Sequence, residues 1–318
     1  MKVMLRSFPY VLACLCLFLM QDASGRQKLT SEEKAAFAAR EDSLRVLAYH
    51  ILYGKKDPER SEACLQFSTL LQTTLERDKS FLYPFDSLSS IARLTAPDRT
   101  FRIFNWNMPL DDGTFRYFGM VQTYDKKKKS SMLFSLTDGS AEISDPESKL
   151  LGADNWYGAL YYSIIPEQKK RSTYYTLIGW DGNNPQTTKK VIDVIYFDKG
   201  KLRFGAPIFM IPKARPYRLI YEYSSQAIMS IRYYPEPHRI IMDHLAPSKP
   251  QLEGQFIYYG PDLTYDALEL KEGKWIYIPN VNITNPSNNT ISEQAPSQEE
   301  RQQLEQGVQK GLFKKKEE

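Results

Sequence analysis

The amino-acid sequence predicts an α+β protein, in which an N-terminal helical hairpin packs on a large antiparallel β-meander. Two patterns predict this class. Apolar residues recur at helical spacing from about residue 30 to residue 75, and from about residue 99 short runs rich in Tyr, Phe, Ile and Val alternate with turn residues. We expect the meander to be barrel-like or a two-layer curled sheet, with a small β-propeller as the alternative.

The composition is that of a folded globular chain. Of the 318 residues, 42% are hydrophobic and 25% are charged, which excludes a largely disordered chain, a collagen-like chain and a protein with many membrane spans. The formal net charge is only +4 at pH 7, so the chain as a whole offers no electrostatic basis for binding nucleic acid. The high aromatic content, 13%, agrees with β-propensity and cross-strand packing.

The first 25 residues have the pattern of a secretory signal peptide. Lys2 and Arg6 form a basic start, residues 10–20 form an apolar run, and Ala23-Ser24-Gly25 is a small-residue cleavage site. The apolar run is shorter than the ~20 residues of a membrane-spanning helix, which disfavours an anchor, and the surroundings of Cys14 match a lipoprotein signal only loosely. We expect cleavage after Gly25, export to the periplasm or cell envelope, and a mature chain without a transmembrane span.

The predicted helical hairpin covers residues 26–80. Thr30 and Glu33 form a capping box at the start of the first helix, and Gly54 ends that helix. Asp57-Pro58 begins the second helix, with a carboxylate at the cap and proline at the first helical position. Cys64 is the single cysteine of the expected mature chain, so no intramolecular disulfide is expected, and its place in the helical pattern predicts a small buried side chain rather than a nucleophile.

The predicted antiparallel β domain covers residues 81–280, and residues 281–318 form a polar tail that we expect to be mobile. Turn pairs such as Asp112-Gly113 and Asp181-Gly182 separate the runs, because glycine supplies the positive φ of tight hairpins. Strands joined by short turns pair antiparallel, since parallel pairing needs a long crossover. The four lysines at residues 126–129 are expected at a solvated hairpin tip, with contact to a polyanion as the alternative.

Motifs for catalysis and cofactors are absent from the sequence. It has no HExxH or paired CxxC zinc motif, no GxSxG nucleophile elbow and no glycine-rich phosphate loop. We therefore name no catalytic residue, no metal ligand and no cofactor. Asp181 and Asn183 offer oxygen ligands in a short turn and are ligand-binding candidates, although the turn lacks the other acidic ligands of a calcium loop. The alternative is a turn whose side chains bond their own backbone.

The densest polar group lies late in the β domain. Asp243 and His244 end one predicted strand, and Tyr259, Asp262 and Asp266 follow in the next segment. A histidine beside carboxylates can act as general acid and base, whereas Asp and His at strand ends more often bond the loop backbone. These five residues are our further ligand-binding candidates, with a purely structural role as the alternative.

Six segments resemble uncharacterised secreted proteins of Bacteroidota-type bacteria, and together they cover most of residues 94–278. They are LTAPDRTFRIFNWN (residues 94–107), LIGWDGNN (177–184), KKVIDVIYF (189–197), EYSSQAIMSIRYYP (222–235), IIMDHLAP (240–247) and YYGPDLTYDAL (258–268). The resemblance implies an envelope location. It implies no activity, because none is attached to that family.

Two functions remain open at the level of the sequence. The first is a non-catalytic binding or scaffolding module of the cell envelope, whose partner is another envelope protein, a peptide or a glycan. The second is a glycan-directed hydrolase, which needs two carboxylates facing each other across a cleft at roughly 5–10 Å. Asp243, Asp262 and Asp266 are the carboxylates considered for that role. The absence of catalytic motifs favours binding over catalysis.

Overall fold

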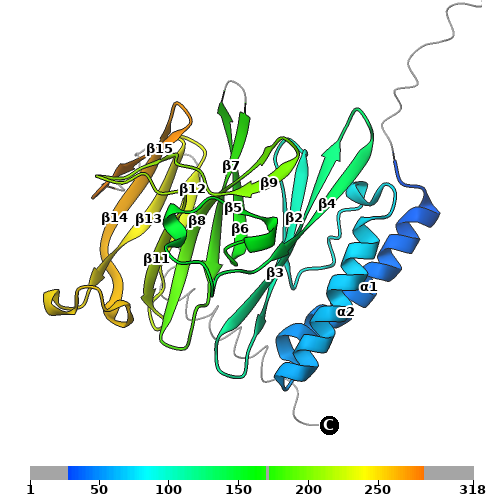
Figure 1. The fold of residues 1–318 in the computed structure, drawn as a ribbon, viewed down its shortest axis with the longest axis horizontal. Helices are drawn as coiled ribbons and strands as arrows, with labels where there is room; N and C mark the ends of the chain where they lie inside the picture. Colours follow the sequence, from blue (N-terminus) through cyan, green and yellow to red (C-terminus); the bar gives the residue numbers. More distant parts are fainter. Residues whose placement is uncertain (1–27, 170–171, 283–318) are drawn as a thin grey trace, which may run out of the picture. The chain divides into compact units, whose positions relative to one another are not determined.

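The computed structural model describes residues 28–169 and 172–282 (Figure 1). The expected signal peptide and nearly all of the expected polar tail lie outside the described residues. The helices and strands divide into a helical pair and three sheets, which confirms the α+β class. No helix in the described part of the chain is long and apolar enough to cross a lipid bilayer.

Two helices come first and pack on each other: α1 (Ser31–Tyr53) and α2 (Asp57–Leu75). The capping box of α1 is confirmed, since the Glu33 N–H donates to Thr30 Oγ1 at 3.1 Å and the Thr30 N–H donates to the Glu33 carboxylate at 2.8 Å. Asp57 is the first residue of α2 and not its cap. Its carboxylate instead accepts from the Arg60 guanidinium and from the backbone N–H of Asp111, which ties α2 to the first sheet.

The strands form three sheets that are almost entirely antiparallel. The first sheet has the order β1 (Ala92–Thr95), β2 (Phe101–Pro109), β3 (Phe115–Asp125), β4 (Ser130–Thr137). The central sheet has the order β5 (Leu151–Gly152), β9 (Lys201–Phe204), β8 (Thr187–Asp198), β7 (Ser172–Asp181), β6 (Leu160–Lys169), and β11 (Leu219–Ser224) also pairs with β8. The third sheet has the order β10 (Phe209–Met210), β15 (Lys274–Ile278), β14 (Tyr259–Lys271), β13 (Arg239–Pro247), β12 (Ile231–Tyr234), with β10 and β15 parallel.

Short 3₁₀ turns complete the described elements. They are η1 (Ser80–Leu82), η2 (Pro146–Ser148), η3 (Ala153–Asn155), η4 (Pro250–Leu252) and η5 (Phe256–Tyr258). Of these, η2 follows the first sheet and η5 lies between β13 and β14, and both contribute residues to the site described below.

The helical pair and the three sheets stack as four layers with three hydrophobic cores between them (Figure 1). Strand side chains alternate between two cores. In β2, Phe104 packs in the core shared with the helices, whereas Ile103 packs in the core shared with the central sheet. In β7, Leu177 belongs to that same core and Ile178 to the core shared with the third sheet. The first and central sheets are therefore buried on both faces.

The α+β class holds, but the expected arrangement of the strands as one barrel-like or curled meander, or as a small propeller, is wrong. None of the three sheets formed by the described strands is closed or curled. Single-sheet closure would bury one face of each strand and leave the other in water. Here the strand runs β2 and β8 are buried almost continuously, which requires a layer on each side.

The predicted burial of Cys64 is confirmed. Its side chain is buried in the core between the helices and the first sheet, and it forms no disulfide. The indole N–H of Trp106 donates to its Sγ at 3.4 Å. Burial raises the pKa of the Cys64 thiol, so the thiolate needed for nucleophilic chemistry is disfavoured.

Candidate functional site

A groove opens between the first and central sheets, at the end where β7 turns into β8. Its volume is about 1140 Å³, and the start of β3, the end of β4, residues 138–147, β11 and Phe256 line it. The charged residues of the lining are Asp138, Glu142, Asp145, Glu147, Asp181 and Glu222 on the acidic side and Arg116 and Lys189 on the basic side. Negative charge therefore predominates in the groove.

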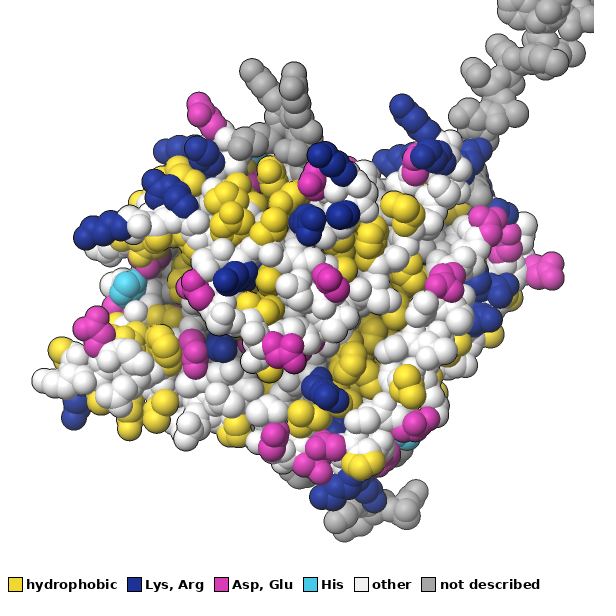
Figure 2. All heavy atoms as spheres, in the orientation of Figure 1, with side chains coloured by type: hydrophobic (Ala, Val, Ile, Leu, Met, Phe, Trp, Pro, Cys, Tyr) yellow, Lys and Arg dark blue, Asp and Glu magenta, His cyan; other side chains and the backbone are white. Residues whose placement is uncertain are grey.

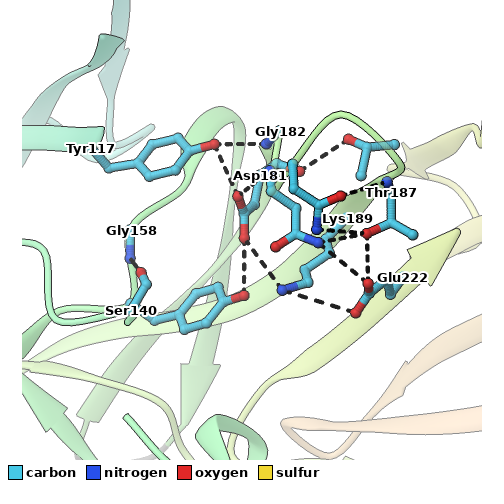
Figure 3. Close-up of polar contacts among 12 residues, drawn as sticks. Tyr117, Ser140, Gly158, Asp181, Gly182, Thr187, Lys189 and Glu222 are labelled. Atoms are coloured by element: carbon cyan, nitrogen blue, oxygen red, sulfur yellow. Dashed lines mark hydrogen bonds and ion pairs between the residues drawn. The ribbon is translucent and has the colours of Figure 1, made fainter. Parts of the chain in front are cut away.

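Three charged residues of the groove lie directly across from one another on neighbouring strands. In the register of the central sheet, Asp181 of β7 pairs with Lys189 of β8, and Lys189 pairs with Glu222 of β11. Lys189 Nζ lies 4.0 Å from Asp181 Oδ2 and 3.9 Å from Glu222 Oε2 (Figure 3). The two carboxylates thus share one ammonium group, a favourable cross-strand arrangement of opposite charges.

Asp181 is the centre of the polar floor of the groove. It is almost fully buried, and both of its carboxylate oxygens accept hydrogen bonds. The Tyr117 hydroxyl donates to Oδ1 and the Tyr157 hydroxyl donates to Oδ2, each at 3.0 Å (Figure 3). The backbone N–H of Asn183 donates to Oδ1 at 2.8 Å. A buried carboxylate is stable only with such donors. Because Tyr117, Tyr157 and Asn183 belong to three different segments, Asp181 links these segments in the floor of the groove.

The two tyrosines remain protonated donors. Burial, followed by the negative charge of Asp181, raises the pKa of both Tyr117 and Tyr157 far above the ordinary tyrosine value. The Tyr117 hydroxyl also accepts from the backbone N–H of Gly182 at 2.7 Å. A side chain at Gly182 would place its Cβ only 2.3 Å from the ring of Phe115. The turn after β7 therefore needs glycine for close approach to the first sheet.

Asn183 and Thr187 connect Asp181 to Glu222. The Asn183 amide donates to Thr187 Oγ1 at 2.6 Å, and the Thr187 hydroxyl donates to Glu222 Oε1 at 2.7 Å. Asn183 has a positive φ of 49°, which asparagine tolerates better than most residues. Side chains of the turn between β7 and β8 therefore belong to the same polar network as Asp181, Lys189 and Glu222.

Asp138 builds the wall on the side of the first sheet. Its carboxylate accepts from the backbone N–H of Tyr117 at 3.1 Å and from the Ser140 N–H at 3.0 Å. Ser140 Oγ in turn accepts from the backbone N–H of Gly158 at 2.7 Å (Figure 3). These bonds join the end of β4 to the segment before β6, so this wall of the groove holds the chain around Tyr157 in place.

The opposite wall contains Glu147 and depends on a buried ion pair. Glu147 Oε1 accepts from the backbone N–H of Ile220 at 2.9 Å, and burial raises the pKa of the Glu147 carboxyl. Behind it, Arg218 pairs with Asp193 at 3.1 Å, and both side chains are fully buried. Arg218 also donates to the carbonyls of Pro146 and Lys149, so it ties the segment carrying Glu147 to the central sheet.

Carboxylates of the groove floor and walls already have hydrogen-bond partners within the protein. These bonds come from groups of the protein alone, so the fold itself positions Asp181, Asp138 and Glu222. The residues that the structure describes contain no group of three or more His, Cys, Asp or Glu side chains placed to hold a metal ion. The groove therefore presents carboxylates beside the aromatic side chains of Phe115, Tyr117 and Tyr157.

The late polar residues form a separate cluster on the third sheet. The Asp266 carboxylate accepts from the Tyr277 hydroxyl at 2.7 Å and lies 2.8 Å from His244 Nδ1. Asp243 Oδ2 accepts from the backbone N–H of Ser230 at 2.7 Å. His244 and Asp266 are thus brought together, whereas Asp243 serves the neighbouring loop.

Tyr259 and Asp262 lie together beside another cavity, of about 530 Å³. The Tyr259 hydroxyl accepts from the Gly254 N–H at 2.9 Å, and Asp262 Oδ1 accepts from both the N–H and the hydroxyl of Thr264. Neither residue lines the acidic groove. Asp243, His244 and Asp266 do not line it either. Of the seven candidates, only Asp181 and Asn183 lie in the groove.

Sequence reasoning missed Tyr117, Tyr157, Lys189, Glu147 and Glu222. One signal was available: a short turn after Asp181 places the first residues of the next strand opposite it, and Lys189 is among them. The other residues come from β3, the segment before β6, η2 and β11, which are far apart in the chain. Their meeting depends on how the first and central sheets stack, and no local pattern reports that.

Comparisons with known proteins add nothing to this picture. No family model matches the chain, and no curated protein or solved structure is significantly similar to it.

Proposed function

We propose that this protein is an exported, non-catalytic binding module of the periplasm or cell envelope, and that its groove holds an extended, positively charged peptide segment of a partner. The observation that carries the proposal is the groove lining, in which six carboxylates face two cations beside apolar side chains. A cleft lined mainly by one sign of charge attracts ligands of the opposite sign. Export rests on the signal-peptide pattern and on the resemblance to secreted proteins.

The strand β11 beside the groove favours a peptide over a glycan. Among the described strands, β11 pairs only with β8. Its Ile220 and Glu222 lie on the groove, and the Ile220 N–H is already taken by the Glu147 carboxylate rather than by another strand. An extended peptide that displaces Glu147 from this N–H can pair with β11, so that its backbone supplies affinity while side-chain pockets supply specificity.

An apolar cavity borders the groove at Glu147 and Ile220. This second cavity has a volume of about 370 Å³ and shares Glu147 and Ile220 with the groove. Leu219, Tyr221 and Tyr277 line it. A peptide that places a basic residue in the groove would reach this cavity with an apolar residue further along its chain, past Glu147 and Ile220.

The test measures binding of two fluorescein-labelled peptides by anisotropy, one alternating lysine with threonine and one alternating glutamate with threonine. We expect binding of the lysine peptide only, weakened by salt. The double variant Glu142→Gln/Asp145→Asn removes two exposed carboxylates of the groove and should weaken binding about fivefold. The matched control Glu62→Gln/Asp42→Asn removes two exposed carboxylates of the helices and should leave binding unchanged. Equal binding of both peptides, or equal loss in both variants, contradicts the proposal.

A glycan-directed hydrolase is the second candidate, with different residues from those the sequence suggested. Asp181 Oδ2 and Glu222 Oε2 both lie near Lys189 Nζ, so they are no more than about 8 Å apart, within reach of the spacing of paired catalytic carboxylates. Release of reducing sugar from envelope glycans, abolished by Glu222→Gln in a variant that still melts like the parent protein, would favour this candidate over the binding module.

A further inference from the structure

Three hairpin tips, one from each sheet, are rich in lysine. They are residues 125–130 between β3 and β4, residues 198–201 between β8 and β9, and residues 271–274 between β14 and β15. Together they contain eight lysines and three carboxylates. The run at residues 126–129 is therefore one part of a larger set.

Hydrogen bonds place these tips at the same end of the stacked sheets. Lys126 Nζ donates to the Asp98 carbonyl at 2.7 Å, and the Asp98 carboxylate accepts from the Tyr175 hydroxyl near the start of β7 at 2.6 Å. On the other side of the central sheet, the Trp275 indole N–H donates to Thr176 Oγ1 at 2.8 Å. Tyr175 also pairs with Ile195, three residues before the β8–β9 tip. The tips thus share one end, which is the upper one in Figure 1.

Most of these lysines are not neutralised. Lys127, Lys129, Lys199, Lys201 and Lys274 are exposed, and none of them forms an ion pair within the described part of the chain. On the face drawn in Figure 2, basic side chains gather along the upper edge and acidic ones are more frequent below. The charge is therefore available to an external partner.

The acidic groove lies at the opposite end. It is built around the β7–β8 turn, whereas the basic tips lie where β8 turns into β9, at the far end of the same strand. The described body therefore has a basic end and an acidic end. Near an anionic surface, attraction at one end and repulsion at the other favour a single orientation.

We propose that the basic end, defined as the three hairpin tips above, docks on the surface of an anionic lipid bilayer. The lysines stand on separate tips spread across all three sheets and none of them lines the groove or the two smaller cavities described above. Lysines spread over three separate tips fit an extended surface better than they fit a single chain in a cleft. Lysine attraction to anionic headgroups acts within about one Debye length. Docking in this way leaves the acidic groove facing away from the bilayer and open to a partner.

The test is sedimentation of the protein with vesicles. Vesicles containing about one third phosphatidylglycerol should bind the protein at low salt and release it as salt rises, because screening shortens the Debye length to about 8 Å at physiological ionic strength. Pure phosphatidylcholine vesicles should not bind. The triple variant Lys127→Gln/Lys201→Gln/Lys274→Gln removes one lysine from each tip, and roughly fivefold per lysine predicts a loss of about a hundredfold in partitioning.

The matched control is Lys55→Gln/Lys149→Gln/Lys249→Gln, which removes three exposed lysines away from the tips and leaves the same net charge. It should bind vesicles nearly as well as the parent protein. Equal loss in the two triple variants would mean that only net charge matters and would overturn the proposal. Binding to heparin with no binding to anionic vesicles would also overturn it and would identify a soluble polyanion as the partner. Peptide binding in the groove is measured without vesicles, so the two proposals fail independently.

Discussion

Replacement of Arg218 by methionine tests whether the buried ion pair holds the groove wall. Arg218 and Asp193 are both fully buried and 3.1 Å apart. Methionine fills much of the same volume without charge, and it leaves the Asp193 carboxylate in the core with no counter-charge. Loss of one partner of a buried pair costs about 3–5 kcal/mol of unfolding free energy. The carbonyls of Lys149 and Phe204, now bonded at 3.0 and 3.2 Å, lose a donor as well.

The pH dependence of that cost follows from Asp193. Burial already raises the pKa of Asp193 while Arg218 lowers it, so Arg218→Met raises it further. A carboxyl whose pKa is higher in the folded state gives its full stability below the unfolded pKa and loses it as pH rises through the folded pKa. The deficit of Arg218→Met relative to the parent protein should therefore be larger at pH 8 than at pH 5.

Urea unfolding at both pH values measures these differences, together with the double variant Asp193→Asn/Arg218→Met. That variant removes both charges, so it should be more stable than Arg218→Met alone, with a residual loss of about 1–3 kcal/mol from the unmet carbonyls. If the double variant is instead less stable than Arg218→Met, or if the deficit does not change with pH, the uncompensated Asp193 charge is not the cause and this reasoning is refuted.

Four further outcomes are expected. N-terminal sequencing of the protein from its source cell should begin at Arg26 or within a few residues, and an intact initiator methionine would contradict export. Cys64 should react slowly with a thiol reagent in native buffer and rapidly in denaturant; fast native labelling would contradict its burial. Tyr117→Phe, which removes the donor to Asp181, should lower the unfolding free energy by about 1–3 kcal/mol, measured by urea titration. Asp243→Ala should cost a similar amount because it leaves the half-buried N–H of Ser230 without its acceptor, whereas an unchanged melting temperature would point to a ligand role.

The candidate site shows why the sequence identified only part of it. Asp181 and Asn183 stood out because a turn concentrates polar residues locally. Glu222 and Tyr117 did not, because one belongs to an ordinary alternating strand and the other resembles any core aromatic. The late cluster around His244 was conspicuous in the sequence for the same local reason, yet it formed a separate network that serves the third sheet.

Local patterns were sufficient for the two helices and for the antiparallel pairing of strands joined by short turns. Capping residues and helical spacing predicted the two helices, and short turns predicted antiparallel strands, because both depend on groups within a few residues of one another. The partition into three sheets, the burial of β2 and β8 on both faces, and the meeting of Asp181 with Tyr117 and Glu222 depended on the tertiary structure alone. These features arise when apolar faces from distant segments cover each other, and hydrophobic burial is non-directional, so the strand sequences do not encode which faces meet.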